Sequence, residues 1–172
     1  MTRIHLAADH GGYELGRALE RRAREAGHDV VWHGAGEYDK GDDYPVFAFR
    51  VARGVVEDQD ANLDAFGALV VEEPAAGLIA ANKVNGARAI VTGSPAEAIR
   101  LRKLTDANVL VLGGEYFELT AWQSLVAFVG AHLDHVVANG RRILQIEEYE
   151  NAGTIEGWAI QLEPEQIAIS YE

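Results

Sequence analysis

Short apolar runs alternate with amphipathic segments along most of the chain. The apolar runs have the length and composition of buried strands, and they cover residues 4–8, 29–33, 68–71, 87–91 and 108–112. Apolar residues recur at helical spacing between and after these runs, and the predicted helices cover residues 15–26, 45–56, 77–81, 95–104, 119–133 and 141–150. Strands that alternate with helices in this way indicate a parallel sheet with right-handed crossovers. The pattern therefore predicts an α/β fold with a doubly wound, five-stranded parallel sheet.

The C-terminal segment departs from this pattern. Residues 158–162 and 166–171 alternate apolar and polar positions around the turn Glu163-Pro164-Glu165, which is typical of a β-hairpin. An isolated hairpin is only marginally stable in water, so we expect it to pack on its own domain or on a neighbouring subunit. The sequence thus predicts a domain over residues 1–150 and a C-terminal extension over residues 151–172.

The amino-acid composition argues against several kinds of binding partner and of catalytic chemistry. The 172 residues carry a formal net charge of −12, which argues against nucleic acid or an anionic membrane surface as partner. The absence of cysteine excludes disulfides, thiolate metal sites and a cysteine nucleophile or base. No apolar run reaches the ~18 residues that a membrane helix needs, and no signal peptide is visible. We therefore expect a cytoplasmic protein that acts on a small molecule.

The segment Gly67–Arg88 contains the most informative turn. It runs from the apolar strand at residues 68–71 through Glu72-Glu73-Pro74 into the helix predicted at residues 77–81. Such a strand-to-helix turn is where open α/β sheets bind ligands, and the amides of a helix N-terminus favour anions. Here two carboxylates repel an anion, and proline removes one amide donor. The turn lies where a ligand is expected, but its charge is wrong for a phosphate.

Four local motifs in order along the chain resemble one family. They are Ala8-Asp9-His10-Gly11-Gly12-Tyr13-Glu14-Leu15, Asp43-Tyr44-Pro45, Ile79-Ala80-Ala81-Asn82-Lys83-Val84, and Asp106-Ala107-Asn108-Val109-Leu110 leading into Gly113-Gly114. Together they are similar to the type B ribose-5-phosphate isomerase and galactose-6-phosphate isomerase family, over about residues 3–150. The resemblance implies a Rossmann-like three-layer α/β/α sandwich. It also implies aldose–ketose isomerisation of a sugar phosphate through an enediolate, without metal or cofactor.

The resemblance further implies a homodimer or tetramer whose active site is completed by the neighbouring subunit. The family motifs place substrate contacts at matching positions in this chain, which are Asp9, His10, Tyr44, Asn82, Lys83 and Arg142. Each position also has a simpler interpretation, such as a helix cap at Asp9, packing of Tyr44 on the following proline, or a basic turn at Arg142. In the galactose-6-phosphate branch two unlike chains share one active site, so a paralogous partner chain is a further option.

Several functional positions of the family carry other residues here. They are Val71 in place of the catalytic cysteine, Gly77 in place of the alternative glutamate base, Glu72-Glu73-Pro74 in place of a Gly-Thr-Gly anion loop, Leu104 in place of the ring-opening histidine, Glu115 in place of an arginine, and Ala138-Asn139 in place of Arg-His. The base, the anion loop, the ring opener and most phosphate contacts are thus altered. We expect a remodelled pocket.

Two hypotheses about function follow. In the first, the protein isomerises a sugar with less negative charge than a phosphate ester; His10 and Glu72 or Glu73 are then catalytic, with one glutamate as the base. In the second, it is an inactive homologue that binds sugar or serves as a structural subunit of a mixed oligomer. The two glutamates could instead bind an ammonium group or be solvated. His132 and His135, three apart on the predicted helix, could chelate a metal, but no other ligand spacing supports a metal site.

Overall fold

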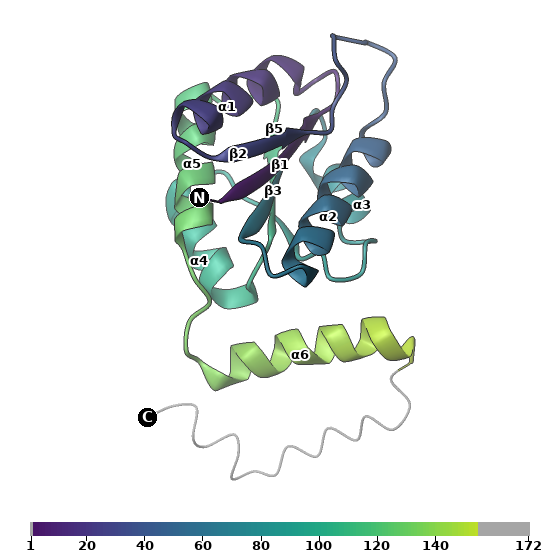
Figure 1. The fold of residues 1–172 in the computed structure, drawn as a ribbon, viewed down its shortest axis with the longest axis vertical. Coiled ribbons are helices and arrows are strands. Elements are labelled where there is room, and N and C mark those ends of the chain that lie inside the picture. The colour runs from purple at the N-terminus through teal and green to yellow at the C-terminus, as the bar shows by residue number, and fades with distance from the viewer. Residues whose placement is uncertain (1, 155–172) are drawn as a thin grey trace.

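The computed structural model describes residues 2–154, and its centre is one parallel sheet of five strands (Figure 1). The strands are β1 (Arg3–Ala8), β2 (Asp29–Trp32), β3 (Ala65–Val71), β4 (Ala89–Val91) and β5 (Val109–Gly113). They lie in the order β2-β1-β3-β5-β4, and every neighbouring pair is parallel. The α/β fold with a five-stranded parallel sheet is therefore confirmed.

Helices cover both faces of the sheet, which gives three layers (Figure 1). The helices are α1 (Tyr13–Glu25), α2 (Tyr44–Asp60), α3 (Pro74–Ala81), α4 (Pro95–Thr105), α5 (Glu118–Gly130) and α6 (Val137–Ala152). Residues of α1, α4 and α5 share one apolar cluster with one face of the sheet, and residues of α2 and α3 share a second cluster with the other face. Leu15, Phe47 and Leu125 lie in these clusters as their helical spacing predicts, whereas Leu104, Leu119 and Val126 are exposed.

Burial explains why the central strands could be recognised as continuous apolar runs. All seven residues of β3 are buried, because the strand lies between two neighbours and under helices on both faces. Leu15 and Leu19 of α1 are buried one turn apart, as the helical period requires.

The order of the strands creates one switch point. From β1 the chain crosses to β2 on one side of the sheet and later returns to β3 on the other side. The connections that leave β1 and β3 therefore lead to helices on opposite faces, α1 and α3 (Figure 1). A crevice at such a point, outside the carboxyl ends of the strands, is the usual ligand site of this architecture.

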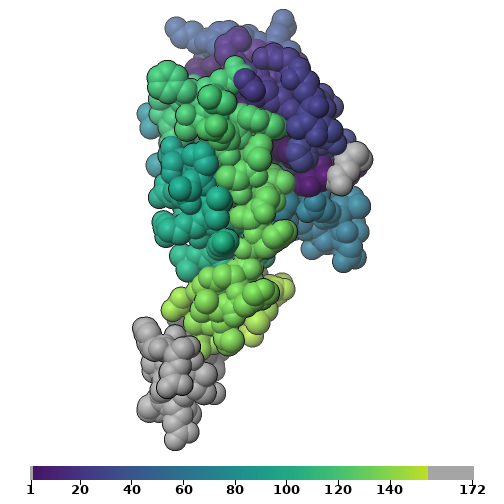
Figure 2. Space-filling view, turned by 90° about the vertical axis from the view of Figure 1, so that its left-hand side faces the viewer, coloured from purple at the N-terminus to yellow at the C-terminus, as the bar shows by residue number. Residues whose placement is uncertain are grey.

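Helix α6 lies apart from the layers. It crosses below the edge of the sheet where the strands begin, and it projects from the foot of the α/β body (Figures 1 and 2). Asn139 is its only buried residue within the described part of the chain. Its far end is held by Glu150, whose carboxylate accepts a hydrogen bond from the Gly86 N–H at 2.8 Å.

Four predicted helix boundaries differ from the structure by three residues or more, and the first is the end of α2, at Asp60 rather than residue 56. Helix α5 ends at Gly130, because Ala131 is extended, and the prediction to residue 133 followed apolar residues that belong to the connection. Helix α6 begins at Val137 rather than residue 141, and α3 begins at Pro74, which suits the first turn of a helix, rather than at Gly77. The predicted hairpin at residues 158–171 lies outside the described residues. No helix described between residues 2 and 154 is long and apolar enough to cross a membrane.

Candidate active site

Four side chains meet at the carboxyl ends of β1 and β3. Asp9 and His10 follow β1 directly, Glu72 follows β3, and Asp42 ends the connection between β2 and α2. The switch point, called the crevice below after the usual ligand site of this architecture, therefore receives groups from three separate connections. The turn at Glu72-Glu73-Pro74, which the sequence singled out, is one of them.

Asp9 is buried, and its carboxylate binds backbone N–H groups of both connections, after β1 and after β3. Its residue surface is 2% exposed, and its carboxylate accepts hydrogen bonds from the Gly12 N–H at 3.0 Å and from the Glu72 N–H at 3.1 Å. Burial raises the pKa of the Asp9 carboxyl, and the two backbone donors oppose that rise. Asp9 thus joins the connection after β1 to the connection after β3. Its predicted contact with a substrate stays a prediction.

The two glycines after His10 allow these connections to touch. A Cβ atom at Gly11 would lie 2.4 Å from the Glu72 Cβ, and one at Gly12 would lie 2.2 Å from the Val70 carbonyl oxygen. Both distances are far below van der Waals contact, so any side chain at either position would push Glu72 or β3 away.

His10 lies between two carboxylates. Its Nδ1 is 3.0 Å from Asp42 Oδ1 and 3.2 Å from the Asp42 carbonyl oxygen, and its Nε2 is 3.1 Å from Glu72 Oε2. The backbone N–H of His10 also donates to Asp42 Oδ1 at 2.7 Å. The hydrogen bond to Asp42 raises the pKa of His10, burial lowers it, and the charges of Asp9 and Glu72 raise it further. The imidazolium form therefore has partners on both of its ring nitrogens.

The two glutamates of the turn differ in position. Glu72 reaches His10, and its side chain is 62% exposed, so a ligand in the crevice can contact it. Glu73 is also exposed; its backbone carbonyl accepts hydrogen bonds from Ala76 and Gly77 at the start of α3. Among residues 2–154, no hydrogen bond or ion pair is found for the Glu73 side chain. Glu72 is therefore the glutamate that the geometry pairs with His10.

Among the other predicted substrate contacts, Asn82 contacts β4 rather than His10. Tyr44 begins α2 and packs against the apolar cluster of that face, two residues after Asp42. Asn82 ends α3 and bonds with its side chain to the Leu78 carbonyl and to both backbone groups of Ala89. Because Ala89 begins the edge strand β4, Asn82 lies where the strands begin, whereas His10 follows the carboxyl end of the inner strand β1.

Lys83 and Arg142 are likewise remote from this crevice. Lys83 follows Asn82 and is exposed, and Arg142 is exposed on α6, where it donates to Asn139 Oδ1 at 3.1 Å. Lys83 lies in the connection between α3 and β4, and α6, which carries Arg142, crosses below the edge of the sheet where the strands begin (Figure 1). Contacts from these residues to a ligand at His10 remain a prediction, and they would require another subunit.

Sequence reasoning missed Asp42. The residue lies in a polar connection rich in aspartate and glycine, where nothing distinguishes it from Asp39 or Asp43. Only the fold brings it next to His10, which is 32 residues earlier. Its position just before the Asp43-Tyr44-Pro45 turn was the one signal available.

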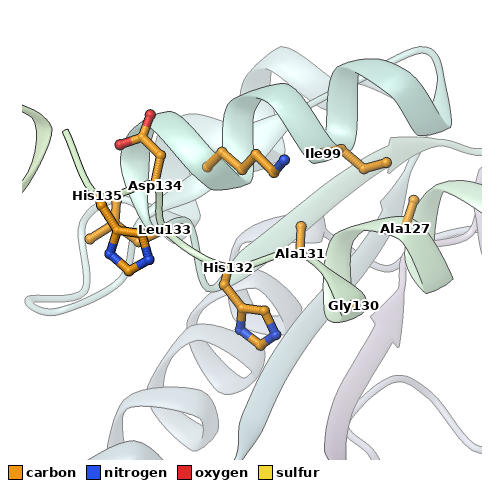
Figure 3. Close-up of a pocket in the computed structure, with 9 residues that line it drawn as sticks. Ile99, Ala127, Gly130, Ala131, His132, Leu133, Asp134 and His135 are labelled. Carbon is orange, nitrogen blue, oxygen red and sulfur yellow. The ribbon is translucent and has the colours of Figure 1, made fainter.

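His132 and His135 do not form a pair on a helix. Both lie in the connection between α5 and α6, where they line a groove with Lys103, Ile99 and Asp134. Figure 3 shows the two imidazole rings well apart along this connection. In residues 2–154, no three His, Asp or Glu side chains are placed to hold a metal ion.

Comparison with known proteins assigns the chain to one family. The model of the "Ribose/Galactose Isomerase" family matches residues 4–146. Ribose-5-phosphate isomerase B of Mycobacterium tuberculosis is 33% identical over 149 residues, which cover 86% of this chain and 90% of that protein. The enzyme of the same name from Escherichia coli is 31% identical over 136 residues, covering 78% and 87% of the two chains.

A solved structure agrees with this relationship. Ribose-5-phosphate isomerase B of Mycoplasma genitalium, crystallised with bound ribulose-5-phosphate, superposes with a TM-score of 0.80 at 30% identity, covering 87% of this chain and 97% of that one. Fold, motif order and sequence identity over most of both chains point the same way. The chain belongs to the ribose/galactose isomerase family.

Proposed function

We propose that the protein is an aldose–ketose isomerase that interconverts its sugars through an enediol in the crevice at β1 and β3. The observation that carries this proposal is the pair of His10 Nε2 and Glu72 Oε2, 3.1 Å apart at the switch point of the sheet. A carboxylate and an imidazole can serve as the base and the acid that a proton shift between adjacent carbons needs. The membership of the family supports the same reaction class.

The proposed reaction moves two protons, and each residue returns to its starting state. Glu72 takes the proton from C2 of the aldose while His10 Nε2 donates a proton to the carbonyl oxygen O1, which gives the enediol. Glu72 then returns its proton to C1, and the O2 hydroxyl returns a proton to His10, which leaves the ketose. Glu72 thus carries the carbon-bound proton, and His10 carries the oxygen-bound proton.

The charge around the crevice supports a substrate less anionic than a phosphate ester. Asp42, Glu72 and Glu73 lie at or beside the crevice, and Pro74 removes a backbone donor from the first turn of α3. A phosphate in the first turn of that helix would meet two carboxylates in place of amide donors. The M. genitalium relative holds ribulose-5-phosphate, so we propose that this chain accepts a related sugar with a neutral group at the position of the phosphate.

We also propose that the protein functions as an oligomer, because α6 exposes much apolar surface. Val137, Leu144 and Ile146 on this helix are 84%, 59% and 51% exposed. Apolar side chains gathered on one projecting helix are typical of an interface. Light scattering after gel filtration tests this, with Leu144→Glu expected to shift the mass towards a monomer.

A panel of sugars tests the proposed activity. Neutral pentoses and hexoses are compared with their phosphate esters by kcat/KM, with interconversion followed by proton NMR. We expect conversion of at least one neutral aldose, with a kcat/KM at least about 10-fold above that of its phosphate ester, which corresponds to about 1.4 kcal/mol. Faster conversion of the esters would contradict the charge argument, and no conversion of any sugar would contradict the isomerase itself.

A further inference from the structure

Asp42 contacts His10 more extensively than any other residue of the crevice does. Its Oδ1 accepts both the backbone N–H of His10, at 2.7 Å, and the ring Nδ1–H, at 3.0 Å, and its carbonyl oxygen lies 3.2 Å from the same Nδ1. The Asp42 side chain is only 9% exposed, whereas the His10 side chain is 28% exposed. His10 is therefore held from the buried side, and its other nitrogen faces the crevice.

A carboxylate at this position is costly for the fold alone. The second oxygen of Asp42, Oδ2, is buried and has no hydrogen-bond partner among the described residues. A buried acceptor without a partner costs about 1–3 kcal/mol. The oxygen of an asparagine could accept the same backbone N–H, so anchoring the connection does not require a charge. What aspartate adds over asparagine is a negative charge against the His10 ring.

The negative charge of Asp42 influences the position of the proton shared by His10 and Glu72. His10 Nε2 and Glu72 Oε2 are 3.1 Å apart, so one proton must lie between them, because two unprotonated acceptors would repel each other. The proton can reside on His10, which leaves Glu72 a carboxylate, or on Glu72, which leaves His10 neutral. A negative charge on the far side of the ring favours the first arrangement.

We propose that Asp42 is the positioning residue of the active site, which holds His10 as an imidazolium and so leaves Glu72 free to act as the base. This inference rests on the proposed function, since it assigns the acid and the base of that reaction. Asp42 itself does not touch the substrate. Among the described residues, the charged groups that face His10 are Asp42, Glu72 and the buried Asp9.

The first test is a titration of the His10 ring by nitrogen NMR, with the signal assigned from the spectrum of His10→Gln. The wild-type protein is compared with Asp42→Asn and with the matched control Asp43→Asn, which removes the same charge from the next, exposed residue. We expect the pKa of His10 to fall by about one unit or more in Asp42→Asn and by much less in Asp43→Asn. Equal shifts in the two variants would overturn the inference.

The wild-type protein alone provides a test that does not depend on folding of the variant. At pH 6.5 both ring nitrogens of His10 are expected to show the chemical shifts of an imidazolium. A neutral ring at that pH, with the proton on Nδ1 only, would overturn the proposed assignment of acid and base.

Kinetics distinguish a positioning role from a structural one. If His10 must be protonated, kcat/KM falls on the basic side of the pH profile, and Asp42→Asn moves that fall to lower pH by the shift seen in the titration. A uniform loss of activity with an unmoved profile would overturn the positioning role. If the wild-type protein converts no sugar, the proposed function fails, while the titration still shows whether Asp42 controls the charge of His10.

Discussion

The chain contains two clusters of histidine and carboxylate in which the pKa of one histidine is shifted in opposite directions, downward at His33 and upward at His10. In the first, under α2, the Asp58 carboxylate lies 2.8 Å from His5 Nε2, and His5 Nδ1 lies 2.8 Å from His33 Nε2. One proton on each ring satisfies every nitrogen in this line, if His33 donates to His5 and His5 donates to Asp58. Burial, helped by the neighbouring His5 and Arg50, lowers the pKa of His33 to about 4.

The second cluster also combines histidine with carboxylates, but here a single histidine faces an oxygen acceptor at each of its two ring nitrogens. Both nitrogens of His10 face oxygen acceptors, on Asp42 and Glu72, so two ring protons are needed to satisfy them. The hydrogen bond to Asp42 raises the pKa of His10. The two clusters show that the hydrogen-bond partners of a histidine and its exposure to water determine its role. A buried histidine can stabilise the fold as a neutral donor, whereas a histidine with two acceptors is available to transfer a proton.

Arg3 is a second difference between the two clusters, because it is a cation bound to the carboxylate of the first one. It donates to Asp58 at 3.2 Å and to Asp29 at 2.7 Å, so the negative charge of Asp58 already has a cationic partner. Burial raises the pKa of Asp58, but the hydrogen bonds from His5 and Arg3 outweigh burial and lower it. The carboxylate of the first cluster thus has Arg3 as a cationic partner, whereas among residues 2–154 Glu72 has an ion pair only with His10.

Replacing one histidine in each cluster should show which cluster is needed for catalysis. We expect His10→Gln to lower kcat/KM by about 10²–10⁴-fold, which is the usual contribution of a general acid or base. His33→Gln should leave kcat/KM within about 3-fold of the wild type, because His33 lies outside the crevice. Steady-state kinetics on the best sugar of the panel measure both, and similar losses in the two variants would show that the distinction is wrong.

Crowding the first cluster should cost stability. A Cβ atom at Gly54 would lie 2.4 Å from His5 Nδ1 and 3.2 Å from His33 Nε2, and the His5 ring is held between Asp58 and His33. We expect Gly54→Ala to lower the free energy of unfolding by about 1–3 kcal/mol, as measured by urea denaturation. The control is Gly140→Ala on α6, where a Cβ would meet nothing within 4 Å, and which should be neutral or stabilising by up to about 1 kcal/mol. An unchanged Gly54→Ala protein would mean that the cluster is loosely packed.

The pH dependence of stability should differ in sign between the clusters. Because the folded pKa of His33 is about 4, the unfolded chain binds more protons between pH 4 and about 6.5, and stability falls as pH falls through that window. His10 has a raised pKa, so its contribution is complete below pH 6.5 or so and is lost as pH rises through its folded value.

These small effects are measured as the difference in free energy of unfolding between each variant and the wild type, from urea denaturation at a series of pH values. Taking the difference cancels the titration of the carboxylates that all the proteins share. His33→Gln should flatten the acidic side of the stability profile, and His10→Gln should flatten the side above pH 6.5. The reverse pattern, or parallel profiles for all three proteins, would contradict the two charge states.

The sequence predicted the fold well because the fold depends on local patterns. The apolar runs at β1, β3 and β5 are buried on both faces and leave a clear signal. The end of α5 was misplaced because Leu133 and the histidines around it continue the helical spacing, although the chain has already left the helix at Ala131.

The site was predictable only where it adjoins a strand. The rule for strand ends drew attention to the turn at Glu72, which follows β3, and the family motif drew attention to His10, which lies just after β1. Asp42 could not be found in this way, because its role depends on a connection that folds back over the crevice. The choice between Glu72 and Glu73 also required the structure, since consecutive residues point in different directions and only one of them meets His10.

The proposed transfer of protons by Glu72 can be tested by the incorporation of deuterium from heavy water into C1 or C2 of the sugar. Wild-type protein, Glu72→Gln and the neighbouring Glu73→Gln are incubated in parallel with the best sugar of the panel, and deuterium is followed by NMR. If Glu72 is the base, the wild type and Glu73→Gln incorporate deuterium at similar rates, and Glu72→Gln is slower by about 10²-fold or more. Undiminished incorporation by Glu72→Gln, or none by the wild type, would contradict the proposed active site.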